Sequence, residues 1–321
     1  MANARSIHDI VELSGGGRRA RGGELERARG VDAAAHGGKI IQLFYNPAAG
    51  GYREATITEL TRVLTDTGAR VRLTPSMDRP PAIDPAATHI CIAGGDGTVR
   101  HVAEALVSAN RQLPVAIYPA GTINLLAREG GFEHRPAAHM AQALVQGPTR
   151  PHRPVRVGGS MFFACASAGP DSLAVAQVSA SPLKRYIGRF AYVAAIGRLL
   201  RHWPRHRIAL SANGTSWDCE AVYIAKGRYY AGPWSFAPQA KVDDGQLHIV
   251  ALRRARRREF LHFYWQMLSG GDVTRDKNII SFTCTALSLQ SDQPLPFQGD
   301  GDVLAMCPVE INVENTPVHI C

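Results

Sequence analysis

Beyond about residue 38, short apolar runs alternate with segments whose apolar residues recur at helical spacing. The runs KIIQLFYNP, ARVRLTP, THICIAGGDGT and LPVAIYPAGT predict strands, and the segments 48–68, 99–110 and 124–131 predict helices. Strands that alternate with helices indicate an open parallel sheet with helices on both faces. Ligands bind such sheets at the carboxyl ends of the strands, which is where the glycine-rich turns of this chain lie.

From about residue 150 the pattern changes to short strands separated by turns. The predicted strands lie at 154–159, 161–169, 206–214, 216–227, 245–253, 278–291 and 308–315, and helix-like segments interrupt them at 182–203 and 256–271. Many short strands indicate a β-rich second domain, which we expect to be a sandwich. The predicted fold class is therefore α/β plus β, with a doubly wound parallel-sheet domain followed by a β-sandwich domain.

These patterns divide the chain into a tail and two domains. Residues 1–37 are rich in Gly, Arg and Ala, with SGGGRRARGG at 14–23, and predict a basic, mostly disordered tail. A solvated extension without function is the plain interpretation of this tail, and attraction to a membrane or a partner is the alternative. We expect the α/β domain at 38–152 and the sandwich at 153–307.

Composition and charge narrow the classes of partner. The 321 residues carry a formal net charge of +9, which favours an anionic partner such as a phosphorylated ligand or a membrane surface. Nucleic-acid binding would rest on net charge alone, and we do not expect it. The six cysteines stand singly without a CxxC pair, which fits a reducing cytoplasm and indicates no zinc site. No apolar run reaches the roughly 18 residues that cross a bilayer, so a soluble or peripheral protein is expected.

The most specific local motif is Gly94-Gly95-Asp96-Gly97-Thr98, between a predicted strand and a predicted helix. Glycines let a backbone approach a polyphosphate closely, and the amides and dipole at a helix N-terminus favour negative charge. The carboxylate of Asp96 would repel such a ligand unless a metal ion or a proton lies between them, which favours a chemical role for this residue. A tight turn with a capping Asp is the plain alternative.

A second loop follows the next predicted strand and reads Pro119-Ala120-Gly121-Thr122-Ile123-Asn124-Leu125-Leu126-Ala127-Arg128. Gly121 permits a turn, Thr122 and Asn124 supply short hydrogen-bonding side chains at a helix start, and Arg128 is long enough to reach a phosphate. Alone, this loop could be a helix cap. The two loops together indicate a nucleotide site.

These residues resemble the catalytic domain shared by diacylglycerol kinases, sphingosine kinases and related bacterial lipid kinases. GGDGT alone also resembles NAD kinases and phosphofructokinases, but the resemblance extends over about residues 39 to 313. It includes Asn46-Pro47, the PxGTxNxxAR loop, Gly169-Pro170-Asp171, Arg189-Phe190-Ala191-Tyr192, Ala237-Pro238, Asp243-Asp244-Gly245 and Asp300-Gly301-Asp302.

The resemblance implies an ATP-binding first domain and a β-sandwich that carries the lipid site, with a last strand near 308–321 that returns to the first domain. The residues expected at ATP are Asn46, Thr74, Gly94, Gly95, Asp96, Gly97, Thr98, Arg100, Gly121, Thr122 and Asn124. It also implies a structural Mg²⁺ at an Asp-Gly turn, with the side chain of Asp244 and the carbonyls of Lys241 and Gln246 as ligands, since magnesium prefers oxygen.

The same resemblance implies carboxylate chemistry. The residue at the position of the family's late Asp-Gly-Glu carboxylate, the proposed base for the lipid hydroxyl, is Asp302, which is one methylene shorter. Asp96 is the alternative base, and a shared network of Asp96, Asp244, Asp300 and Asp302 is a third arrangement. Asp171 is expected to contact the lipid head group, and Arg100 or Arg128 to neutralise charge on the γ-phosphate.

Two departures from the family pattern leave other functions open. The first-strand motif NPxSG is NPAAGG here and lacks a hydroxyl, and Leu125 stands where an Asp is frequent. The main expectation is an ATP-dependent kinase for a diacylglycerol-like or sphingoid-like lipid, acting from the cytoplasm at the inner face of the membrane. An NAD kinase-like enzyme and a non-catalytic nucleotide- or lipid-binding protein are the alternatives. The sequence leaves open which lipid is used and whether the chain forms a homodimer.

One further segment suits a bilayer interface. Five arginines between Arg253 and Arg258 precede the aromatic residues Phe260, Phe263, Tyr264 and Trp265. Basic residues beside aromatics favour contact with an anionic membrane. A solvated loop followed by a helix that faces the core is the plain alternative.

Overall fold

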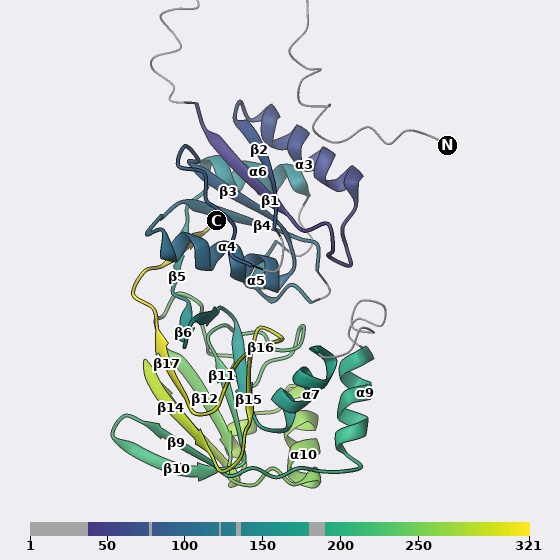
Figure 1. Ribbon diagram of the computed structural model, residues 1–321, viewed down its shortest axis with the longest axis vertical. Helices are drawn as coiled ribbons and strands as arrows, with labels where there is room; N and C mark the ends of the chain where they lie inside the picture. The colour runs from purple at the N-terminus through teal and green to yellow at the C-terminus, as the bar shows by residue number, and fades with distance from the viewer. Residues whose placement is uncertain (1–37, 77–78, 122, 133–135, 180–189) are drawn as a thin grey trace, which may run out of the picture. The chain divides into compact units, whose positions relative to one another are not determined.

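The computed structural model describes residues 38–76, 79–121, 123–132, 136–179 and 190–321 (Figure 1). Lys39–Cys321 is one compact unit. The tail predicted at 1–37, residue Thr122 and the first part of the helical segment predicted at 182–203 lie outside the described residues. The division of the compact unit near residue 152 stays a prediction.

A six-stranded sheet is built from the first part of the chain and its last strand, in the order β2-β1-β3-β4-β18-β5. The strands are β1 (Ile40–Tyr45), β2 (Arg70–Pro75), β3 (His89–Gly94), β4 (Pro114–Pro119), β5 (Arg150–His152) and β18 (Val318–Ile320). All neighbouring pairs are parallel except β18 with β5. The near-continuous apolar runs of β1, β3 and β4 follow from burial on both faces.

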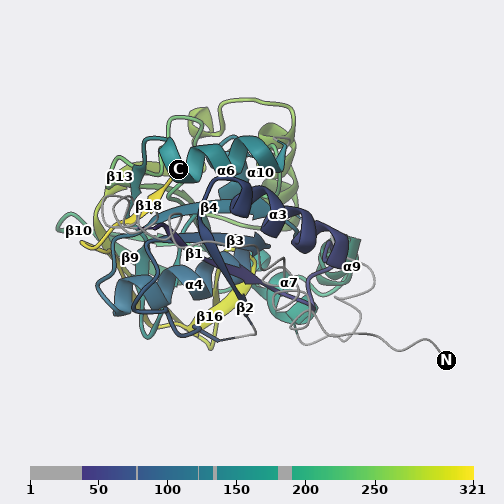
Figure 2. The same cartoon turned by 90° about the horizontal axis from the view of Figure 1, so that it is seen from above.

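Helices cover both faces of this sheet (Figure 2), and the alternation of side chains along its strands separates two apolar layers. Ile41, Leu43 and Cys91 face α3 (Glu54–Asp66) and α6 (Ala137–Gln146). On the opposite face, Phe44, Ile90, Ile92, Val115 and Ile117 pack with α4 (Asp96–Ser108) and α5 (Leu125–Glu129). Helices on both faces of a parallel sheet confirm the doubly wound prediction.

Two antiparallel sheets form the β-sandwich. One has the order β10-β9-β14-β17-β6-β7 and the other β13-β12-β11-β8-β15-β16. The first contains β6 (Val155–Val157), β7 (Ser160–Phe162), β9 (Ile208–Ala212), β10 (Thr215–Cys219), β14 (Ala286–Ser291) and β17 (Val309–Val313). The second contains β8 (Cys165–Ala168), β11 (Ala221–Ala225), β12 (Leu247–Leu252), β13 (Ile279–Cys284), β15 (Pro296–Gly299) and β16 (Asp302–Met306). Inward residues of both sheets share one buried cluster, which confirms the sandwich.

Helices cover the outer face of the second sheet. Tyr223 and Val250 point out of the sandwich core and pack with Phe263 and Met267 of α10 (Arg257–Leu268). Two more helices, α7 (Pro170–Ser179) and α9 (Phe190–Leu199), pack against each other through Ala174, Val178, Ala195 and Leu199. The prediction of a helix at 256–271 is confirmed by α10, and α9 lies in the segment predicted at 182–203.

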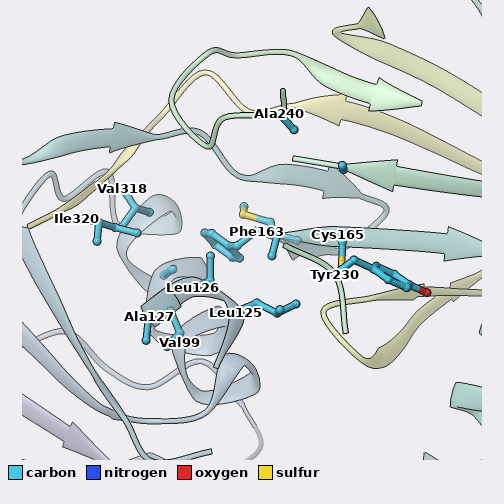
Figure 3. Packing of buried hydrophobic residues seen from close by; sticks show 14 of the residues in the cluster. Val99, Leu125, Leu126, Ala127, Phe163, Cys165, Tyr230, Ala240, Val318 and Ile320 are labelled. Atoms are coloured by element: carbon cyan, nitrogen blue, oxygen red, sulfur yellow. The ribbon is translucent and has the colours of Figure 1, made fainter. Parts of the chain in front are cut away.

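The apolar core continues from the α/β layers into the sandwich (Figure 3). Val99 of α4 and Leu125 and Leu126 of α5 share a buried cluster with Phe163 and Cys165. Val318 and Ile320 of the last strand belong to the same cluster. This shared core fixes the glycine loops at the ends of β3 and β4 against the strands of the sandwich.

Candidate functional site

Three loops meet at the carboxyl ends of β1, β3 and β4. The backbone N–H of Gly51 donates to the carbonyl of Ala120 over 3.1 Å, and the N–H of Ala120 donates to the carbonyl of Gly94 over 3.1 Å. A Cβ placed on Gly121 would lie 2.5 Å from the Cα of Gly95, so the two glycine loops touch backbone to backbone and no side chain fits between them. The loops that the sequence places after successive strands are therefore neighbours.

The loop after β3 opens directly into α4. Gly95 is the N-cap of this helix, and a Cβ on Gly94 would lie 2.5 Å from the Cβ of Thr98. A helix N-terminus with free amide groups is favourable for an anion. The site therefore offers a close backbone approach and positive dipole at one place, the two features that phosphate binding requires.

Polar side chains from the first two strands reach the same edge of the sheet. Asn46 donates from Nδ2 to Oγ1 of Thr98 over 3.3 Å, and its Oδ1 accepts from the N–H of Ala48. Thr74, near the end of β2, accepts from the side chain of Gln42 over 3.1 Å. Asn46 thus lies beside the glycine loop, whereas Thr74 contacts a side chain of strand β1.

The carboxylate of Asp96 joins the two glycine loops. Its oxygens accept hydrogen bonds from the N–H groups of Leu125 at 3.1 Å and Leu126 at 3.2 Å, the first residues of α5. Asn124, with φ of 54°, makes the left-handed turn before this helix and holds Gly121 through two side-chain hydrogen bonds. Burial raises the pKa of Asp96, those amides oppose the shift, and the Asp302 carboxylate adds to it.

The carboxylate of Asp300 is bound by three consecutive backbone amides. Phe163, Ala164 and Cys165 donate to it over 2.7, 2.9 and 3.1 Å. Burial raises the pKa of Asp300 to about 6; the amide hydrogen bonds oppose the shift, and the Asp96 carboxylate adds to it. This geometry makes Asp300 a clamp between the β15–β16 turn and the β7–β8 turn.

Asp302 is the carboxylate that faces the glycine loop and solvent. Its side chain is 34% exposed, and Oδ2 lies 3.0 Å from Nη2 of Arg100 in α4. A Cβ on Gly97 would lie 3.5 Å from the same oxygen. Arg100 is itself buried and also lies 3.8 Å from Glu104. Among the three carboxylates of this site, Asp302 has the position best suited to meet a substrate.

Arg128 lies on α5 with its guanidinium carbon 5.3 Å from the ring centre of Tyr229. The neighbouring Glu129 accepts a hydrogen bond from the backbone of Tyr229 over 2.9 Å. These contacts attach α5 to the segment that follows β11. The structure places Arg128 against an aromatic ring, and its contact with a phosphate stays a prediction.

A second polar cluster surrounds Asp171, at the start of α7. Its oxygens accept hydrogen bonds from Ser167 at 2.5 Å and Tyr264 at 2.9 Å, and Nε2 of Gln298 lies 3.4 Å away. The same Gln298 accepts from the backbone N–H of Gly301 over 3.1 Å. Gln298 therefore connects the Asp171 cluster to the turn that carries Asp300 and Asp302.

The turn at 241–246 contains the expected magnesium ligands, but a lysine side chain lies against them. Nζ of Lys226 lies 2.8 Å from the carbonyl of Val242, 3.4 Å from that of Lys241 and 3.6 Å from Oδ1 of Asp244. The other carboxylate oxygen of Asp244 lies 3.3 Å from His248, and Gln246 contributes its backbone N–H to Asp244. A lysine ammonium thus faces two of the oxygens that were expected to bind the metal, and the four-carboxylate network that would include Asp244 stays a prediction.

Sequence reasoning missed two residues of these clusters, Lys226 and Gln298. Each is a buried polar residue at the end of an apolar strand, in AVYIAK and PFQ. A lone lysine that ends a run of five apolar strand residues was the available signal, because lysine is almost never fully buried without a partner.

Comparisons with known proteins agree with this geometry. Residues 41–157 match the diacylglycerol kinase catalytic domain, and residues 164–321 match the YegS C-terminal NAD kinase beta sandwich-like domain. A probable lipid kinase YegS-like of Pseudomonas fluorescens is 31% identical over 220 residues, which cover 68% of this chain and 71% of the relative. The diacylglycerol kinase of Bacillus subtilis is 25% identical over 233 residues, which cover 72% and 76%.

Other matches are shorter or structural. A probable lipid kinase YegS-like of Pseudomonas aeruginosa is 38% identical, but the alignment covers 50% of this chain and 52% of the relative. The crystal structure of a putative diacylglycerol kinase from Bacillus anthracis superposes with a TM-score of 0.70 at 19% identity, covering 88% of this chain and 97% of the other, which shows a shared fold. The chain belongs to the YegS-like lipid kinase family, with its diacylglycerol kinase catalytic domain and YegS-type C-terminal sandwich.

Proposed function

We propose that this protein transfers the γ-phosphate of ATP to a hydroxyl group of a diacylglycerol-like or sphingoid-like lipid. The observation that carries the proposal is the position of Asp302, whose carboxylate lies over Gly97 in the glycine loop and beside Arg100. A carboxylate next to a phosphate-binding loop is suited to an acceptor hydroxyl and serves less well for binding a nucleotide alone. Family membership supports the same reaction class.

The triphosphate binds, in this proposal, where the loops after β3 and β4 touch. The amides at the start of α4 and around Gly121 approach the phosphates without side chains in the way, because only glycine fits at the contact. Asn46 and Thr98 supply polar groups on the β1 side. Magnesium accompanies ATP as part of the substrate and neutralises its negative charge.

Asp302 then orients the lipid hydroxyl and accepts its proton. The hydroxyl oxygen forms a bond to the γ-phosphorus, the bond from that phosphorus to the β–γ bridging oxygen breaks, and ADP leaves. Arg100 holds the Asp302 carboxylate in place over 3.0 Å and adds positive charge beside the transferred group. Asp171, with its Ser167 and Tyr264 partners, is assigned to the lipid head group.

Transfer from γ-labelled ATP tests the reaction and its acceptor. The purified protein is incubated with Mg²⁺ and mixed micelles of diacylglycerol, monoacylglycerol, sphingosine, ceramide or phosphatidylglycerol, with NAD in a separate reaction. A labelled lipid supports the proposal and names the acceptor. Label on NAD alone would move the function to NAD phosphorylation, and measurable ATP binding without any product would leave a binding protein.

We further propose that α10 docks on an anionic membrane, from which the lipid substrate is taken. Leu261, Trp265 and Leu268 recur at helical spacing and are 49%, 69% and 44% exposed, on the side of the helix away from the buried Phe263 and Met267. All five arginines between Arg253 and Arg258 are exposed at the beginning of this helix. An apolar stripe beside positive charge is typical of an interfacial helix that binds anionic lipid. No described helix is both long enough and apolar enough to pass through a bilayer.

Sedimentation with vesicles tests this docking surface. We expect binding to vesicles that contain phosphatidylglycerol, weak binding to phosphatidylcholine alone, and release by salt. Replacing Leu261 and Trp265 together by Ser should reduce binding to anionic vesicles tenfold or more, since apolar burial that contributes at least about 1.4 kcal/mol is lost. Met306→Ser removes an equally exposed apolar side chain on β16 and is the matched control. Equal loss in both variants would remove α10 from the proposal.

A further inference from the structure

Lys226 places a positive charge inside the protein. It follows the last residue of β11, and its side chain is 0% exposed. Its backbone N–H and that of Gly227 both donate to the carbonyl of Ala164, which fixes the start of the side chain. Since an unpaired ammonium is very costly to bury, the groups around Nζ must compensate its charge.

The groups that contact Nζ directly are oxygens of the turn between β11 and β12. Nζ lies 2.8 Å from the Val242 carbonyl, 3.4 Å from the Lys241 carbonyl and 3.6 Å from the Asp244 carboxylate. An ammonium carries three N–H donors, and three oxygens surround it. Backbone carbonyls and a carboxylate are also the oxygen types that bind hard divalent cations.

The ammonium and a divalent cation exclude each other at this turn. Magnesium binds its oxygen ligands at about 2.1 Å, so an ion bound to the Lys241 carbonyl, which is 3.4 Å from Nζ, would lie no more than about 5.5 Å from the ammonium. Two like charges at such a distance repel strongly in a buried environment. His248, on the second oxygen of Asp244, further limits the space for a metal's water ligands.

We propose that the Lys226 ammonium takes the position of the structural divalent cation expected at the 241–246 turn, so that this turn is ordered without any metal. Magnesium is then required with ATP and not for the fold. The inference rests on the contacts of Lys226 and is independent of the proposed kinase reaction.

Thermal unfolding and metal content of the nucleotide-free protein test the inference. We expect the Tm of the wild-type protein to agree within about 1 °C in EDTA and in millimolar Mg²⁺, because a ligand without a site on the folded state does not shift the folding equilibrium. Elemental analysis after desalting should find no stoichiometric divalent metal. A Tm that falls by several degrees in EDTA, or about one bound metal per chain, overturns the inference without any variant.

Two substitutions of Lys226 distinguish the effect of its charge from the effect of its volume. Lys226→Ala empties the position and leaves the three oxygens, so its lowered Tm should rise again in millimolar Mg²⁺ or Ca²⁺. Lys226→Met fills the position with an uncharged side chain of similar length, and its lowered Tm should not respond to metal. Equal rescue of both variants contradicts the inference, because metal would then act elsewhere. If neither variant folds, the wild-type comparison alone decides.

Discussion

Nη2 of Arg100 lies 3.0 Å from Oδ2 of Asp302, although 202 positions separate the two residues along the chain. Arg100 belongs to the second turn of α4, which the glycine loop opens, and Asp302 begins β16 of the sandwich. The ion pair therefore ties the glycine loop of one sheet to a carboxylate of another. Removal of the Asp302 charge should change the chemistry of the site more than the stability of the fold, since the Asp302 side chain is one-third exposed.

Asp302→Asn should lower the rate of lipid phosphorylation by about 10²-fold or more, because an amide cannot accept the hydroxyl proton. The Tm should change by only a few degrees, and the affinity for ATP by little, since the glycine-loop amides remain. Steady-state kinetics with Mg-ATP and the lipid identified by labelling measure both effects. Asp218→Asn, on an exposed position of β10, is the control.

Asp302→Glu tests how much the length of this side chain matters. Glutamate adds one methylene and moves the carboxylate by on the order of 1 Å, a displacement that can alter rates by ~10²-fold in either direction. We expect measurable activity in this variant and far less in Asp302→Asn. Near-normal activity of Asp302→Asn would transfer the base role to Asp96.

Asp96→Asn should reduce turnover and also weaken the fold locally. The carboxylate accepts from the amides of Leu125 and Leu126, whereas asparagine offers one acceptor and turns an N–H₂ group toward the other amide. Loss of such a cap costs about 1–2 kcal/mol of stability. Chemical denaturation gives this free energy and the labelled-ATP assay gives the rate. An unchanged unfolding midpoint together with lost turnover would assign Asp96 to chemistry alone.

The parallel sheet was predictable because its signals are local. Ile41, Ile92 and Ile117 lie in apolar runs long enough to be buried on both faces, and glycine-rich turns end the strands after them. Two helices, α6 and α7, were not predicted. Six of the ten residues of α7 are buried around its circumference, so the one-sided apolar stripe that marks a helix is missing.

Strands of the sandwich were predicted with the wrong limits. The run 216–227 contains β10 and β11, and the run 278–291 contains β13 and β14, with the members of each pair in different sheets. When an apolar run passes from one sheet to the other, its hydrophobicity does not change at that point. The sequence pattern therefore does not show where the first strand ends and the second begins. The hairpin of β15 and β16 was missed because its strands have only four and five residues and the first of them ends in Gly299.

The site was predictable only as far as neighbouring strands define it. Gly95 and Gly121 follow successive strands of one sheet, so their contact was implied by the order of the strands. The pairs Arg100–Asp302 and Lys226–Asp244 depend on how the sandwich folds, which local patterns do not contain. The contact of Lys226 with the 241–246 turn in particular is absent from the Asp-Gly motif, at which the family resemblance implied a magnesium site.

Gln298→Met should uncouple the Asp171 cluster from the turn that carries Asp302. The glutamine donates to Ser167 over 2.9 Å and accepts from Gly301 over 3.1 Å, and methionine has similar volume without either bond. We expect about a tenfold lower kcat/KM for the lipid with an unchanged KM for ATP, and a loss of roughly 1–3 kcal/mol in stability from unpaired buried groups. Equal effects on both substrates would indicate general unfolding and not positioning. Gln290→Met, on a largely exposed strand position, is the control.

His152 should make the folded state sensitive to mild acid. It is 1% exposed, and since a carbonyl only accepts, its Nε2 donates a proton to Phe163 over 2.7 Å. Burial, followed by the charge of Lys226, lowers the pKa of His152 from 6.5 to about 3. The unfolded chain therefore binds a proton below about pH 6.5 that the folded protein does not bind until about pH 3, so stability falls as the pH falls through this window.

Asp300 affects the pH dependence of stability in the opposite sense. Its pKa of about 6 in the folded state exceeds the ordinary value of 3.8, so between these two values the folded state binds the extra proton and stability rises as the pH falls. The contributions of His152 and Asp300 to the change of stability with pH partly cancel in the wild-type protein. The His152 contribution must therefore be measured as the difference in stability between wild type and a variant that lacks this histidine. His152→Gln keeps a donor for the Phe163 carbonyl and does not titrate. Urea unfolding from pH 7.5 to 5 should show wild type losing stability relative to this variant by up to about 1.4 kcal/mol per pH unit below pH 6.5, with no relative change above pH 7. Parallel profiles for the two proteins would mean that His152 becomes protonated in the folded state as readily as in the unfolded chain.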